Sequence, residues 1–175
     1  MDELFSGAHP HLLVNHAPIF GAVFALALLV ASFLWAPDVL RRTAFVVLIV
    51  TAIAGWAADL TGDPAEDAIR GFPGVQRRLI HLHEQMADRA LIIAGVLAVL
   101  ALVALVRWRR TRVPASVTAV GVLLTAFSSG AFIYTGLLGG RIRHTEVRPG
   151  ATPADAIVIE PRPTRPPGAP DGPPR

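Results

Sequence analysis

Residues 90–106 read ALIIAGVLAVLALVALV, a continuous apolar run without a single charged side chain. A helix that crosses the hydrocarbon core of a bilayer needs about 20 predominantly apolar residues. Three further uncharged runs of similar length cover residues 17–36, 43–58 and 113–138. The sequence therefore predicts an all-α, integral membrane four-helix bundle. The predicted helices cover about 17–36, 43–60, 79–106 and 114–138.

Composition supports a membrane protein whose main partner is the lipid bilayer. Of the 175 residues, 53% are hydrophobic and 17% charged, and the mean hydropathy is +0.51. Soluble domains carry about 25% charged residues. The absence of cysteine excludes thiolate zinc sites, iron–sulfur ligation, c-type haem attachment and disulfides. The net charge of +3 comes from scattered arginines, which do not form the basic stripe of a nucleic-acid-binding protein.

The connections predict an up-down-up-down topology within one domain, residues 1–148. Residues 37–42 and 107–114 form short basic connections, whereas residues 61–78 mix acids, arginines, glycine and proline. Up-down-up-down order is the simplest arrangement for such connections. It places every histidine at one end of the bundle: His9, His11, His16, His81, His83 and His144.

The two ends of the chain predict orientation and an unstructured tail. Arginines are densest in the two short connections, and residues 1–16 contain no basic side chain. The positive-inside rule then places these connections in the cytoplasm of a bacterial inner-membrane protein, with both termini and the histidine end periplasmic. Residues 149–175 are rich in proline and poor in apolar side chains, which predicts a disordered tail. A polyproline segment that binds a partner is the alternative.

The histidines are the candidate ligands. HLLVNHAPI carries His11 and His16 at the start of the first helix, and HLHEQ carries His83 at the start of the third. His16 and His83 are the first predicted ligand pair, His144 is a substitute or third ligand, and His11 is next. Two imidazoles can hold a haem iron, and three can hold a small metal ion.

Two nearby carboxylates are predicted to assist. Glu84 and Glu66 would ligate the metal, orient its ligands or move protons. For Glu84 the alternative is an interfacial ion-pair network, and for the acids that include Glu66 it is a helix stop and N-cap. For single histidines the alternative is hydrogen bonding to water. Asp63 is interpreted as the N-cap of a short helix that ends near Arg70. A stripe of alanines between residues 87 and 101 indicates either close helix packing or a slot for a flat ring.

The histidine and glycine motifs resemble the bacterial four-helix membrane family called domain of unknown function 2231. That family has a His-rich opening motif and a closing GG…H motif, and the resemblance spans most of residues 9–146. By this resemblance His11 and His16 match the opening histidines, and LGGRIRH supplies Gly139, Gly140 and His144. TGDPAED and HLHEQ are more similar to a narrower, uncharacterised bacterial subgroup. Members occur beside or fused to Rieske-type iron–sulfur domains, which implies a redox context.

These features predict a small redox-associated membrane protein. It would bind b-type haem, or an iron, copper or zinc ion, through histidines at one membrane face, and serve as an electron-transfer module or subunit. Its partner would be a membrane or periplasmic redox protein. The alternative is a non-catalytic accessory subunit whose histidine end is a docking surface. No residue is assigned a catalytic role, and assembly as an oligomer is left open.

Overall fold

The computed structural model describes residues 7–35 and 37–152, which contain helices and no strand. Four long helices are accompanied by two short ones and a terminal 3-10 turn. Their bounds are α1 His9–Val14, α2 Ala17–Ala31, α3 Pro37–Leu60, α4 Gly62–Ile69, α5 Arg77–Arg107, α6 Ala115–Arg143 and η2 Thr145–Val147. The all-α class is confirmed.

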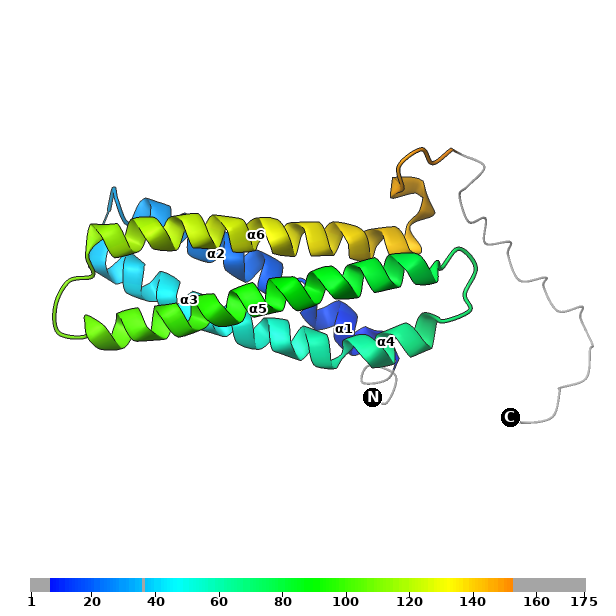
Figure 1. Ribbon diagram of the computed structural model, residues 1–175, viewed down its shortest axis with the longest axis horizontal. Helices are drawn as coiled ribbons and strands as arrows, with labels where there is room; N and C mark the ends of the chain where they lie inside the picture. Colours follow the sequence, from blue (N-terminus) through cyan, green and yellow to red (C-terminus); the bar gives the residue numbers. More distant parts are fainter. Residues whose placement is uncertain (1–6, 36, 153–175) are drawn as a thin grey trace, which may run out of the picture.

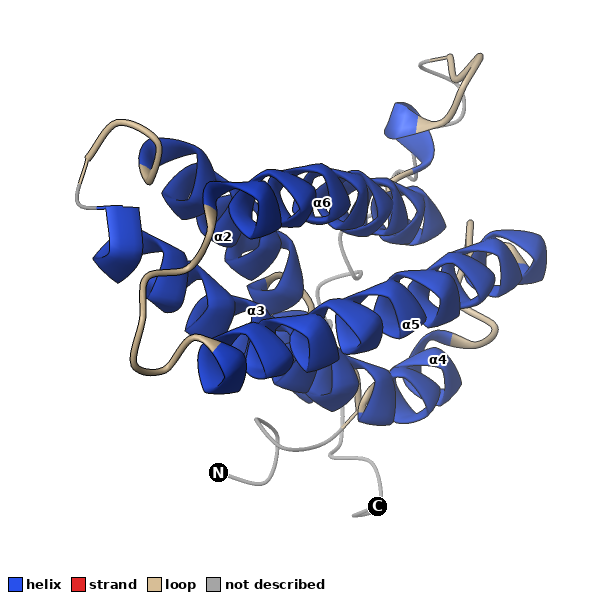
Figure 2. Ribbon diagram, turned by 60° about the vertical axis from the view of Figure 1, so that its left-hand side comes forward, coloured by secondary structure: helices blue, strands red, loops and turns tan. Residues whose placement is uncertain are grey.

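The long helices pack as a four-membered ring. Each lies against the long helix next to it in the chain, and α6 closes the ring against α2. Helices α2 and α5 are therefore diagonal. The α2–α3 and α5–α6 connections lie at the left-hand end of Figure 1, whereas α1, α4 and η2 lie at the right-hand end. Figure 2 views the bundle obliquely, with the end that carries these connections turned toward the reader.

Four segments are long and apolar enough to cross a membrane: His9–Ala31, Pro37–Ile69, Arg77–Arg107 and Ala115–Arg143. Large apolar side chains such as Phe20, Leu123 and Phe127 point outward and are about 70% exposed. A soluble bundle would bury this surface in its core. The helices thus present their apolar side chains where lipid hydrocarbon would surround them.

Small residues let the helices approach closely. A Cβ atom added at Gly21 of α2 would collide with the Thr51 hydroxyl of α3, and one added at Gly136 of α6 would lie 2.8 Å from Ile19 Cδ1. Ala90 and Ala94 of α5 are buried against α2 and α6. Such contacts replace the hydrophobic driving force, which is weak between helices in lipid.

The buried face of α6 is lined by hydroxyls, a feature not anticipated from the sequence. Its members are Thr118, Thr125, Ser128, Ser129 and Thr135. Ser129 Oγ donates to the Thr125 carbonyl at 2.8 Å, and Thr135 Oγ1 donates to the Ala131 carbonyl at 2.9 Å. Bonds to the preceding turn satisfy these two hydroxyls at a helix interface, whereas the buried Thr125 hydroxyl has no hydrogen-bond partner among the described residues.

Helix α3 begins at Pro37 and not near residue 43, so the prediction of a 37–42 loop was wrong. A proline suits the first turn, where its missing N–H costs nothing. Asp38 Oδ1 accepts the Val113 backbone N–H at 2.9 Å, and Asp38 Oδ2 pairs with Arg42 at 2.8 Å. These contacts attach the first turn of α3 to the α5–α6 connection.

Two arginines hold the loops at this end together. Arg42 Nη2 donates to the Trp108 and Thr111 carbonyls at 2.7 and 2.8 Å, and Arg41 Nη1 donates to the Val113 carbonyl at 2.7 Å. Arg41 is buried. Part of the arginine density that predicts orientation is therefore structural.

Two other local predictions were wrong. Helix α6 continues through Gly139 and Gly140 to Arg143, although these glycines were expected to end it. The short α4 helix exists, but its N-cap is Thr61 and Asp63 lies in its first turn. Of the proline-rich tail, residues 153–175 lie outside the described residues.

Candidate functional site

The site lies at the right-hand end of Figure 1, where the short helix α1 carries His11. Pro18 has no N–H to continue the helical hydrogen-bonding from α1 into α2, so the helix is interrupted at Asn15 and His16. On the N-terminal side of this interruption, α1 packs on α3 and α4. The break therefore brings His11 to the end of α3.

His11 is attached to the last turn of α3. Its Nδ1 lies 2.9 Å from the Ala58 carbonyl oxygen and 3.2 Å from Thr61 Oγ1. Thr61 Oγ1 itself donates to the Ala58 carbonyl at 2.8 Å. A carbonyl only accepts hydrogen bonds, so Nδ1 of His11 carries the proton.

His83 is attached in the same manner to α6. Its Nδ1 donates to the Thr135 carbonyl at 2.9 Å, across the α5–α6 interface. A Cβ atom added at Gly139 would lie 3.1 Å from His83 Cε1 and 3.2 Å from His83 Nδ1. Gly139 therefore provides the space for the imidazole, which explains a glycine inside the last turns of α6.

The two rings are neighbours. The centroids of His11 and His83 lie 6.5 Å apart, with their planes at 86°. Since both Nδ1 atoms donate to backbone carbonyls, each neutral ring has its free lone pair on Nε2. Metal-binding histidines in proteins are oriented by the same kind of bond from the second ring nitrogen.

The predicted partner of His83 was His16, but His11 takes this place. His16 is exposed, and its ring stacks on Phe20 at a centroid distance of 6.5 Å. Positions 11 and 16 are five apart, about 140° around a continuous helix, so one helix could not turn both rings inward. This spacing was the available signal that one of the two histidines lies outside the site.

The other histidines lie at the surface of the same end. His81 Nδ1 is 3.4 Å from Glu84 Oε2, and His144 Nδ1 is 2.8 Å from Glu146 Oε1; all four side chains are exposed. Hydrogen bonding to its own backbone N–H, and then to His144, lowers the pKa of the Glu146 carboxyl. His144 is thus engaged with Glu146.

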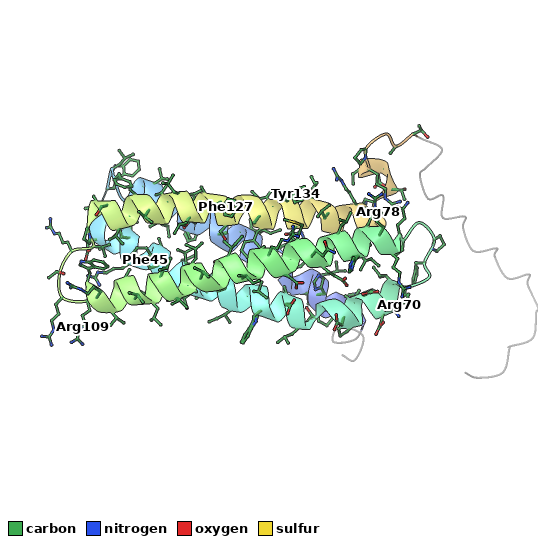
Figure 3. The ribbon with its side chains drawn as sticks, in the orientation of Figure 1. Phe45, Arg70, Arg78, Arg109, Phe127 and Tyr134 are labelled. Atoms are coloured by element: carbon green, nitrogen blue, oxygen red, sulfur yellow. The ribbon has the colours of Figure 1, made fainter. Side chains whose placement is uncertain are left out.

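Glu66 and Glu84 line a separate cavity of about 350 Å³ with Arg77, Arg78, Ile80 and His81. Glu66 accepts from Arg70 at 3.0 Å, and Glu84 Oε2 lies 3.4 Å from His81 Nδ1. Neither His11 nor His83 lines this cavity. Figure 3 places Arg70 and Arg78 at this end, on α4 and α5. Glu84 therefore has a contact of the kind expected from the ion-pair alternative, and Glu66 has an ion pair with Arg70 that the sequence analysis did not anticipate.

The predicted ligands do not assemble as one set. Over residues 7–35 and 37–152, no group of three or more His, Asp or Glu side chains is arranged to hold a metal ion. The alanine stripe is likewise occupied, because Ala90, Ala94 and Ala101 are at most 3% exposed and pack within the bundle. A flat porphyrin does not fit along this stripe as it is packed here. The two imidazoles of His11 and His83 remain as the donor set suited to a small ion.

Comparison with known proteins adds no assignment. No family model matches the chain, and no curated protein or solved structure matches it either. The resemblance of its histidine and glycine motifs to the four-helix membrane family named above stays a prediction.

Proposed function

We propose that this protein is a redox-associated subunit of the bacterial inner membrane that holds one transition-metal ion between His11 and His83. One observation carries the proposal: the two rings are 6.5 Å apart, and both Nδ1 atoms are bonded to backbone carbonyls. Because each metal–nitrogen bond is about 2.0 Å, two imidazoles on one ion have ring centres roughly 6 Å apart when they lie on opposite sides of the ion, and roughly 5 Å apart at a tetrahedral angle. The observed separation supports two rings on opposite sides of the ion.

The donor set favours a late first-row ion. Neutral imidazole suits zinc, copper, iron and nickel, and copper binds nitrogen donors most strongly in this series. Copper is therefore the first candidate, and when bound it would supply one-electron redox chemistry. The chain's own residues hold and orient the two rings through Ala58, Thr61 and Thr135, and Gly139 leaves room for the His83 ring.

The membrane topology is part of the same proposal. Four crossings in up-down-up-down order would put α1, α4 and η2 at one membrane face. By the positive-inside rule the arginine-rich connections would lie in the cytoplasm and that face in the periplasm. A metal between His11 and His83 would then lie where a periplasmic or membrane redox partner can reach it.

Metal analysis of detergent-purified protein tests the proposal. We expect about one copper ion per chain after copper loading and removal of excess metal, and loss of that ion in His11→Gln and His83→Gln. Glutamine retains an amide donor for the backbone carbonyl but lacks the imidazole lone pair. His16→Gln and His81→Gln are the matched controls, since both side chains are exposed at the same end. They should bind metal as the unmodified protein does.

Two results would contradict the metal site: no stoichiometric copper, zinc, iron or nickel in the unmodified protein, or equal loading of all four variants. A reduced-minus-oxidised spectrum of protein purified from haem-replete cells tests whether the bound group is haem. Soret and α bands that disappear in the His83→Gln variant would favour haem over a small ion.

The second candidate is an accessory subunit, favoured by the exposure of His16, His81 and His144. These exposed imidazoles, two of them beside a carboxylate, form a polar surface that can donate and accept hydrogen bonds. Replacing these three histidines by glutamine would weaken association with a partner and leave metal content unchanged. Loss of metal with unchanged partner association in the His11 and His83 variants would support the metal site.

A further inference from the structure

A crevice of about 360 Å³ lies at the end of the bundle opposite the histidines, between α3, α5 and α6. Phe45 and Leu48 of α3 are at its base and are at most 4% exposed. Figure 3 shows Phe45 between α5 and α6, near the connection that joins these two helices. The small side chains of Ala101 and Ala104 on α5 leave the hollow in the surface.

The rim of this crevice is apolar and open. Leu100 and Val103 of α5 and Val120 of α6 are between 47% and 56% exposed. All three belong to segments apolar enough to cross a membrane. The crevice therefore opens toward the region that lipid chains would occupy.

Positively charged side chains adjoin Trp108, one of the residues that line the crevice. Trp108 lines the crevice, and the Arg107 guanidinium lies 5.6 Å from the centroid of the Trp108 ring. Arg109 and Arg110 follow directly, are exposed, and take part in no ion pair among the described residues. Figure 3 shows Arg109 projecting past the end of α5. Asp38, a carboxylate at this end, is already bound by Arg42.

We propose that this crevice binds an anionic phospholipid, with one acyl chain against Phe45 and Ala101 and the phosphate at Arg109 and Arg110. Charge complementarity identifies the occupant: the apolar crevice leads to unpaired arginines at headgroup depth, where a basic side chain attracts anionic lipid. The site is separate from the histidines and does not depend on the metal proposal.

Quenching of Trp108 fluorescence by brominated lipid tests the site, because Trp108 lines the crevice. The other two tryptophans, Trp35 and Trp56, are exposed and are replaced by phenylalanine. The protein is reconstituted in phosphatidylcholine vesicles that contain the same mole fraction of dibrominated phosphatidylglycerol or dibrominated phosphatidylcholine. Both lipids carry a phosphate, but the choline ammonium cancels its charge in phosphatidylcholine. We therefore expect phosphatidylglycerol to quench with an apparent affinity about fivefold higher for each arginine beside the headgroup.

Two sets of variants distinguish the contribution of the arginines from that of the apolar crevice. Arg109→Gln with Arg110→Gln should abolish the preference for phosphatidylglycerol. Arg78→Gln with Arg143→Gln removes the same charge at the other end and should preserve it. Val120→Phe, at the rim, should weaken quenching by both lipids. Val99→Phe, an exposed α5 position outside the crevice, should not.

Equal quenching of the parent protein by the two lipids would overturn the proposal. An unchanged preference in the Arg109 and Arg110 double variant would overturn it as well. Millimolar inorganic phosphate is added as a final arm: loss of the preference would identify a site for free anions and contradict a lipid site. Retention of the preference supports the lipid.

Discussion

Replacing Gly139 by alanine tests whether the His83 imidazole is held against α6. The new Cβ would lie 3.1 Å from His83 Cε1 and 3.2 Å from Nδ1, whereas a relaxed carbon contact is about 3.5–4.0 Å. The ring must therefore move by a few tenths of an ångström, away from the Thr135 carbonyl that its Nδ1 binds at 2.9 Å. Overpacking of this kind costs about 1–3 kcal/mol.

The same substitution at the next residue is the matched control. A Cβ at Gly140 would meet no heavy atom within 4 Å, although the residue lies in the same turn of α6. Gly140→Ala should therefore gain the propensity of alanine in a helix, up to about 1 kcal/mol. Gly139→Ala gains the same amount but loses the packing. The two variants should differ by about 1–3 kcal/mol, with Gly139→Ala the less stable.

Unfolding in detergent micelles, followed by far-UV circular dichroism against added SDS and against temperature, measures the difference. For a chain of this length about 1 kcal/mol changes Tm by roughly 2–4 °C. A double-mutant cycle combines Gly139→Ala with His83→Ala. The added Cβ no longer meets an imidazole in the double variant, so the destabilisation caused by Gly139→Ala should disappear. Equal stability of Gly139→Ala and Gly140→Ala would refute the placement of the imidazole against α6.

Three further predictions concern other parts of the molecule. Gly21→Ala should destabilise the bundle by about 1–3 kcal/mol, because the added Cβ meets the Thr51 hydroxyl, and Thr51→Ala in the same chain should restore most of the loss in an unfolding titration. Arg42→Gln removes an ion pair and two bonds to loop carbonyls, so unfolding should become easier by about 1–3 kcal/mol, and amide exchange in the α5–α6 connection should accelerate. The pKa of Glu146 is lowered in the folded protein, so its contribution to stability is present above the usual carboxyl pKa and is lost as pH falls through the lowered value. In a ¹³C NMR titration His144→Gln should raise the Glu146 pKa toward its usual value, and an unchanged titration would show that the backbone bond alone lowers it.

Composition predicted which segments form the long helices, but it did not predict the residues at which these helices begin and end. The uncharged runs predicted four long helices because a bilayer requires both length and apolarity. Helix α3 nevertheless begins at Pro37, because Asp38 and Arg42 bind the distant α5–α6 connection. Helix α6 continues through Gly139 to Arg143, and the absence of a side chain at Gly139 makes room for the His83 ring. Contacts between residues remote in sequence therefore accompany both differences from the predicted boundaries.

The candidate site shows the same division. The sequence by itself determined the helical class, the four apolar segments and the gathering of histidines toward one end, because hydropathy and spacing are local properties. Only the tertiary structure decided which imidazoles meet. Pro18 separates α1 from α2, α1 packs across the end of α3, and His11 instead of His16 comes to lie beside His83. The direction of a side chain at a helix break depends on the surface against which the short helix packs, and that surface is built by residues about 50 positions further along the chain.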